Sequence, residues 1–174
     1  YRKGDYSTAL RVLEEAGKLA PTHPAVLSSF AQVQAATGRF GDAMVSYRKL
    51  LEQQPNNAFA LNNLAYILAD TDGDLGEALT LSQKALRQQP QHPSLLDTLA
   101  LICIKKGMPD SAIQISRNLT GKHPRNPVYR YHLAMSLANK GRREEARTEL
   151  ERALSDQPSQ SFERKISGLL AGLK

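Results

Sequence analysis

The fold is decided by the stretch AFALNNLAYILADTDGDLGEALTLSQKALRQQP, residues 58–90, and by the stretch PSLLDTLALICIKKGMPDSAIQISRNLTGKHP, residues 93–124. In each stretch, a first apolar segment with helical spacing leads through a turn containing glycine into a second helical segment, which ends before a proline. Small residues stand at matching positions of the two stretches, so they indicate an internal repeat.

The repeat extends over nearly the whole chain, and its prolines define its length. Successive members of the proline series are 34 or 35 residues apart. A period of about 34 residues is typical of a helix–turn–helix unit. The series consists of Pro21, Pro55, Pro90, Pro124 and Pro158.

Alanine recurs at one position of every first helix and at one position of every second helix. A longer side chain at a close helix crossing would push the two axes beyond about 8–10 Å, so alanine is expected where the hairpin helices meet. Leucines at helical spacing flank these positions and give each first helix an apolar stripe. The alanines are Ala31, Ala65, Ala100 and Ala134 on first helices, and Ala9, Ala43, Ala78, Ala112 and Ala146 on second helices.

Each turn between the paired helices contains one glycine, at Gly38, Gly73, Gly107 and Gly141. We expect these glycines to adopt the left-handed conformation that ends a helix. The unit that begins at Ala58 is one residue longer than the others, and the surplus falls within residues 70–74. A turn accommodates such an insertion at low cost.

These repeats resemble those of tetratricopeptide repeat proteins over nearly the whole chain. The resemblance implies an all-α fold, a right-handed α-solenoid of helix–turn–helix repeats with a C-terminal capping helix. We expect one array over residues 1–174. Its parts are the second half of a truncated repeat at 1–23, full repeats at 24–57, 58–92, 93–126 and 127–158, and an amphipathic capping helix at 159–174. Because the pattern starts within a repeat, we expect this chain to be a fragment with further units upstream.

A narrower resemblance rests on three segments of first helices, at residues 61–66, 96–100 and 130–134. They resemble the C-terminal repeats of bacterial tetratricopeptide lipoproteins associated with exosortase/PEP-CTERM sorting and exopolysaccharide export. This resemblance implies an envelope scaffold, periplasmic or anchored in the outer membrane through an upstream cysteine. If that resemblance does not hold, the expected location is the cytoplasm.

In such an array, the concave surface formed by the first helices binds a protein or peptide. Amides there can hydrogen-bond to a peptide backbone, and aromatic or aliphatic side chains can offer pockets. An alternative for Tyr66 and Tyr131 is packing between neighbouring helices with the hydroxyl in water. The expected lining residues are Gln32, Phe59, Asn62, Asn63, Tyr66, Asp97, Leu101, Lys105, Tyr131, His132, Met135 and Asn139.

Other kinds of site are not expected. The alternating Asp70, Asp72 and Asp74 lack the glycine and closing glutamate of a calcium loop. No histidine pair has metal-ligand spacing, and Cys103 is expected in the helix core as a small apolar group. We therefore predict no metal, no cofactor and no catalytic residue. The cationic residues of the carboxylate clamp in chaperone-binding repeat domains are also missing.

The charge of the chain is uneven. Residues 1–87 carry nine basic and nine acidic side chains, and residues 88–174 carry fourteen basic and eight acidic ones. The whole net charge of +6 therefore lies in the C-terminal half. The cations alternate with glutamate and lack stacking aromatics, so we expect a solvated helix face and no nucleic-acid partner. No stretch reaches the roughly 18 apolar residues that a membrane span requires.

Two functions from different classes remain open at this stage. The array is either a binding scaffold within a larger assembly or the non-catalytic repeat region of a longer enzyme, such as a glycosyltransferase. Self-association through exposed repeat ends is a third possibility, because an array cut within a unit exposes an apolar helix face.

Overall fold

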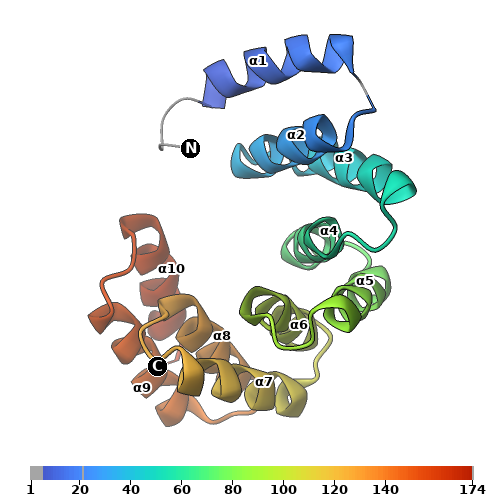
Figure 1. The fold of residues 1–174 in the computed structure, drawn as a ribbon. Coiled ribbons are helices and arrows are strands. Elements are labelled where there is room, and N and C mark those ends of the chain that lie inside the picture. The colour runs from blue at the N-terminus through green and yellow to red at the C-terminus, as the bar shows by residue number, and fades with distance from the viewer. Residues whose placement is uncertain (1–5, 21, 174) are drawn as a thin grey trace. The chain divides into compact units, whose positions relative to one another are not determined.

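The computed structural model describes residues 6–20 and 22–173, and within them the chain forms ten α-helices and no strand (Figure 1). This confirms the predicted all-α helical repeat fold. Pro21 and the side chain of Ala9, both used to set the repeat register, lie outside the described residues. The helices are α1 Tyr6–Leu19, α2 Pro24–Ala36, α3 Phe40–Gln53, α4 Ala58–Asp70, α5 Leu75–Gln88, α6 Pro93–Lys105, α7 Pro109–Lys122, α8 Pro127–Asn139, α9 Arg143–Ser155 and α10 Gln160–Ala171.

The chain divides into two compact units, Tyr1–Pro90 and Gln91–Lys174. The first unit holds α1 to α5, with hairpins α2–α3 and α4–α5, and the second holds α6 to α10, with hairpins α6–α7 and α8–α9 (Figure 1).

Short polar side chains fix where several helices begin. The Asn57 side chain accepts a hydrogen bond from the backbone N–H of Ala60 at 3.0 Å, at the start of α4. The Asp74 carboxylate accepts from two backbone N–H groups in the first turn of α5, and the Asn126 side chain does the same for α8. These caps satisfy N–H groups that the helix itself leaves unpaired.

The turns within the hairpins agree with the sequence in three places and differ in one. Gly38, Gly107 and Gly141 are left-handed, with φ between 69° and 78°. In the α4–α5 turn, the left-handed residue is Asp72, with φ 52°, so the expectation for Gly73 is wrong. Asp72 stands seven residues after the register alanine of its helix, as the three left-handed glycines do, so the extra residue displaces the glycine and leaves the left-handed position unchanged. Aspartate tolerates this conformation better than most residues with a side chain.

The alanines of the repeat register are fully buried in every hairpin, which is the close helix crossing that their spacing predicts. Each of them has no exposed surface, so any larger residue would have to displace the opposite helix. The described members are Ala31, Ala43, Ala65, Ala78, Ala100, Ala112, Ala134 and Ala146.

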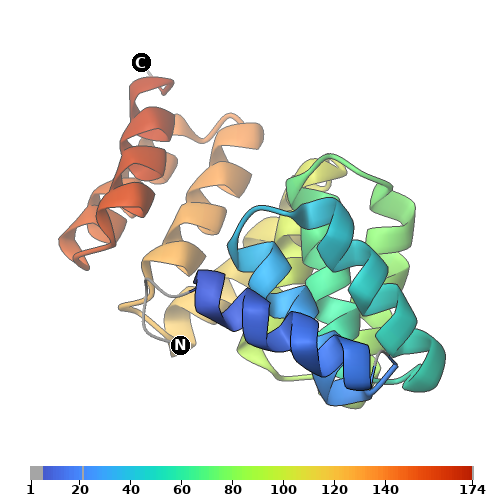
Figure 2. The same ribbon diagram turned by 90° about the horizontal axis from the view of Figure 1, so that it is seen from above.

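The last hairpin of the second unit is covered by α10. Figure 2 shows α10, in red, beside the orange helices α8 and α9. Ile166 of α10 is fully buried in a cluster with Leu137 of α8 and Leu150 of α9. The Phe162 ring of α10 meets Tyr131 of α8 edge to face, with 5.3 Å between ring centroids. The apolar face of the α8–α9 hairpin is therefore shielded from water.

Candidate protein-interaction surface

In the first unit, α4 presents two exposed aromatic side chains on one face. Phe59 is 44% exposed and Tyr66 is 38% exposed. They are seven residues apart, so they lie two helical turns from each other on the same side of α4. Such exposed aromatic groups offer large contact areas to a partner.

Amide groups lie between these two aromatic residues. The Asn63 side-chain amide donates to the backbone carbonyl of Phe59 at 2.7 Å, which orders the side chain along the helix. Asn62 is half-buried, and its side-chain oxygen has no hydrogen-bond partner among the described residues. Gln32 of α2 is exposed and donates to the carbonyl and hydroxyl of Ser28, both at 3.3 Å. The first unit thus combines apolar contact area with hydrogen-bonding groups.

The Phe59 ring is supported from below by Tyr47 of α3. The two rings meet edge to face with centroids 6.1 Å apart. Tyr47 is almost fully buried, and burial raises the pKa of its hydroxyl to about 12. The buried ring holds Phe59 in place while one side of Phe59 remains open to solvent.

In the second unit, the predicted lining residues are less uniform. Lys105 and Asn139 are exposed, and Asp97, Tyr131 and Met135 are half-buried. Leu101 and His132 are only 4% and 8% exposed, so in this structure they contribute packing rather than accessible surface.

The buried His132 joins two first helices of this unit. Its Nδ1 lies 2.7 Å from a carboxylate oxygen of Asp97, which connects α8 to α6. Tyr131, its neighbour, packs partly against Phe162, and burial raises the pKa of the Tyr131 hydroxyl while Lys105 lowers it. Tyr131 therefore serves the packing under α10 as well as the surface.

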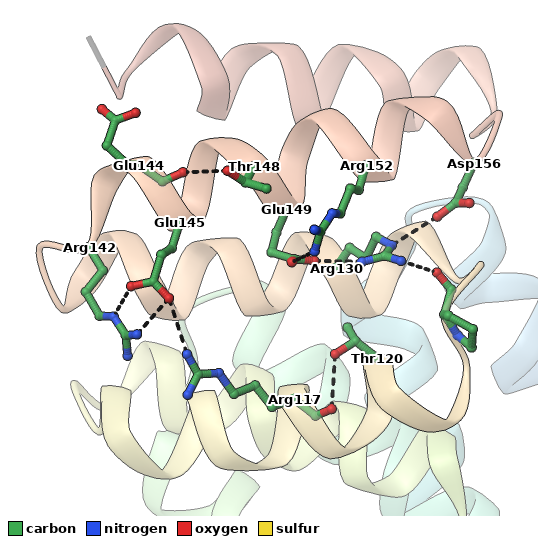
Figure 3. Close-up of polar contacts among 11 residues, drawn as sticks. Arg117, Thr120, Arg130, Arg142, Glu144, Glu145, Thr148, Glu149, Arg152 and Asp156 are labelled. Carbon is green, nitrogen blue, oxygen red and sulfur yellow. Dashed lines mark hydrogen bonds and ion pairs between the residues drawn. The ribbon is translucent and has the colours of Figure 1, made fainter.

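The sequence analysis missed an ion-pair network that holds α8 in place (Figure 3). The Arg130 guanidinium donates to Glu149 of α9 at 2.7 Å, to Asp156 at 3.1 Å and to the Pro124 carbonyl at 2.5 Å. The signal was present in the repeat register, because Arg130 stands where the three preceding first helices have Leu27, Leu61 and Leu96.

Neither a metal-ligand cluster nor an exposed thiol is found among the described residues. No group of three or more potential ligands gathers among residues 6–20 and 22–173. Cys103 is buried, and burial raises the pKa of its thiol, so the reactive thiolate is disfavoured. Of the helices that the structure describes, none has both the length and the apolar character to span a membrane.

Comparison with known families supports the repeat type. Residues 1–65 match the tetratricopeptide repeat family, and residues 71–153 match the family of anaphase-promoting complex, cyclosome, subunit 3. No curated protein matches the sequence.

Solved structures of tetratricopeptide repeat proteins have a similar fold. PilW, a widely conserved type IV pilus biogenesis factor, is 20% identical over 97% of this chain and 78% of its own, with a TM-score of 0.80. A thermophilic TPR protein of Thermus thermophilus is 23% identical over 97% and 90% of the two chains, with a TM-score of 0.75. MamA is 21% identical over 92% and 87%, with a TM-score of 0.70. At these identities, the likeness concerns the fold of an all-α repeat solenoid.

Proposed function

We propose that this chain is a protein- or peptide-binding scaffold that holds its ligand against the first-helix faces of its repeats. The observation that carries the proposal is the α4 face, where Phe59 and Tyr66 flank Asn62 and Asn63. Exposed aromatic residues supply contact area at a low entropy cost, because each has few rotatable bonds. The Asn63 amide between them can pair with a peptide backbone of any sequence. Repeat scaffolds of this type are generally non-catalytic, and the proposal assigns no reaction to the chain.

The α4 face is tested by a variant that removes both aromatic rings. We expect Phe59→Ala with Tyr66→Ala to lose the partner in a pull-down from the source organism. Val45→Ala is the matched control, because Val45 is an exposed apolar residue on α3, a second helix. Capture by the double variant equal to that of the parent would remove α4 from the binding surface.

We also propose that the scaffold acts in the bacterial envelope, in an assembly related to exopolysaccharide export. The resemblance of residues 61–66, 96–100 and 130–134 to envelope lipoprotein repeats supports this role. The fold is also shared with PilW, a pilus biogenesis factor. The pull-down should therefore use envelope and cytosolic fractions separately. Specific capture from the envelope fraction alone is the expected result, and specific capture from the cytosolic fraction alone contradicts the assignment.

The sequence of the surrounding gene provides an independent check. A lipoprotein cysteine encoded upstream is the expected finding for an anchored envelope scaffold. A transferase domain encoded in the same chain would instead identify these repeats as the non-catalytic part of an enzyme.

A further inference from the structure

Consecutive second helices are joined by an ion pair at the same repeat position in both units. In the first unit, Arg48 of α3 forms a two-pronged pair with Glu77 of α5, with 2.8 Å between one pair of atoms. In the second unit, Arg117 of α7 pairs with Glu145 of α9 at 3.3 Å (Figure 3). Arg48 and Arg117 each stand five residues after the register alanine, and the two glutamates each stand one residue before it.

The junction of α1 and α3 cannot form this pair. The equivalent positions hold Glu14 on α1 and Asp42 on α3, two groups of like charge. Asp42 instead forms an ion pair, at 2.7 Å, with Arg39, the residue that precedes α3. The attraction that joins α3 to α5 and α7 to α9 is therefore missing at these two positions.

A wide crevice opens where the pair is missing. It has a volume of about 440 Å³ and lies between α1 and α3 above α2. The corresponding crevice between α7 and α9, which the pair of Arg117 and Glu145 crosses, measures about 200 Å³. The larger volume falls within the range of about 300–1,000 Å³ in which small-ligand sites are found.

The interior of this crevice has an apolar floor and a polar inner edge. Leu27 and Phe30 of α2 line it, and Gly17 of α1 lets the Phe30 ring approach, since a Cβ there would lie 3.0 Å from the ring. At the inner edge, the Ser46 hydroxyl donates to the Gln34 side chain at 2.9 Å. The next unit has leucine at both of these positions, so the site is more polar than its counterpart there.

The rim of the crevice is positively charged. Lys18 of α1 and Lys49 of α3 line its opposite walls, against the single acid Glu14. Both lysines are exposed, and neither has an ion-pair partner among the described residues. An incoming acidic group would thus meet a cation on either wall.

We propose that this crevice is a second docking site, which takes one bulky apolar side chain from an acidic peptide segment. The apolar side chain packs on Leu27 and Phe30, and flanking carboxylates pair with Lys18 and Lys49. The site lies between second helices and shares no residue with the α4 face. The inference is therefore independent of the function proposed above.

A fluorescent peptide tests this proposal directly, because the chain contains no tryptophan. The probe is a synthetic peptide with one tryptophan between two flanks of three aspartates. The control peptide has lysines in place of the aspartates. We expect a saturable change in tryptophan emission with the acidic peptide that weakens as salt is added. No binding, or equal binding of both peptides, would overturn the proposal.

Variants of the crevice locate the binding. Lys18→Glu with Lys49→Glu should weaken binding of the acidic peptide about tenfold. Arg11 is an exposed cation on α1 outside the crevice, so Arg11→Glu should leave the affinity unchanged. Gln34→Leu with Ser46→Leu copies the next unit and should weaken binding by filling the crevice. Circular dichroism confirms that each variant remains folded. Unchanged affinity in both crevice variants would place the peptide elsewhere and refute the site.

The same assay separates this site from the α4 face. Phe59→Ala with Tyr66→Ala should bind the acidic peptide as the parent does. If that variant alone loses the peptide, the acidic segment occupies the first-helix surface and the crevice proposal fails.

Discussion

We expect removal of the Arg130 cation to destabilise the second unit. Arg130 is 15% exposed, and its partner Glu149 is 13% exposed, so both charges are largely withdrawn from water. Arg130→Ala would remove the cation and leave Glu149 and Asp156 without it. The Pro124 carbonyl, which fixes the turn before α8, would lose its donor as well.

The size of the effect follows from this burial. Removing one partner of a buried ion pair typically costs about 3–5 kcal/mol, because the remaining charge stays desolvated and unpaired. Glu149 retains its pair with the exposed Arg152 at 2.7 Å, which places the expected cost near about 3 kcal/mol. For a chain of this length, each kcal/mol lowers the melting temperature by about 2–4 °C, so we expect a decrease of about 6–12 °C.

Replacing all three charged groups of the network by uncharged ones should not lower the melting temperature. In the two preceding repeats, both positions are apolar. Leu61 and Leu96 occupy the position of Arg130, and Leu81 and Ile115 occupy the position of Glu149. Arg130→Leu with Glu149→Leu and Asp156→Asn removes the charges together, so we expect a melting temperature close to that of the parent or above it.

Thermal unfolding followed by circular dichroism distinguishes these outcomes. Arg117→Ala is the matched control, because Arg117 and Glu145 are both about half exposed and such pairs contribute less than about 1 kcal/mol. The reasoning is refuted if Arg130→Ala melts with the parent, or if the triple variant loses as much stability as Arg130→Ala.

Three further predictions concern the surface, a turn and a buried hydroxyl. Phe59→Ala with Tyr66→Ala should change the melting temperature by less than about 4 °C, since both side chains are exposed; a larger loss would show that they support the core. Gly141→Ala should lower the free energy of unfolding by about 1–2 kcal/mol, because its φ of 78° disfavours a side chain, although no atom obstructs the added Cβ. Gly121→Ala, within α7, should instead raise the free energy of unfolding by about 0.5 kcal/mol. Urea unfolding measures both changes. The raised pKa of Tyr47 means that the folded state favours the neutral hydroxyl. The stability that this preference contributes is complete below about pH 10 and is lost as the pH rises toward about 12. The difference in unfolding free energy between the parent and Tyr47→Phe should therefore change with pH only between these two values.

The repeat pattern was sufficient to predict the fold, because each unit must solve the same packing problem. The register alanines mark helix crossings that leave no room for a larger side chain, and all the described ones are buried. The turn of the longer unit was assigned to the wrong residue. The left-handed position stays seven residues after the register alanine, at Asp72, and the insertion places the glycine one residue later. The residue type, rather than the spacing from the alanine, led to the wrong assignment.

The lining of the surface was harder to predict, because exposure depends on neighbours that the register does not specify. Leu101 occupies the register position of the exposed residues Gln32 and Tyr66, yet it is buried. His132 is also buried. His132 is drawn inward by Asp97, which stands 35 residues earlier, and a pairing of that kind between repeats leaves no periodic signal. Tyr131 is partly covered by Phe162, which lies outside the four full repeats.

The residues that depart from the repeat register carry the information that the register lacks. A polar group at a core position costs free energy unless it is paired, and two such departures here have partners: Gln34 with Ser46, and Arg130 with Glu149. At the α1–α3 junction, two acidic residues stand where α3–α5 and α7–α9 have an ion pair, and the surface opens into a crevice with lysines on both walls. Packing accounts for the repeated residues without reference to a ligand. The crevice rim and the α4 face are two parts of the first unit that packing alone does not require, so we expect changes there to alter binding with little effect on stability.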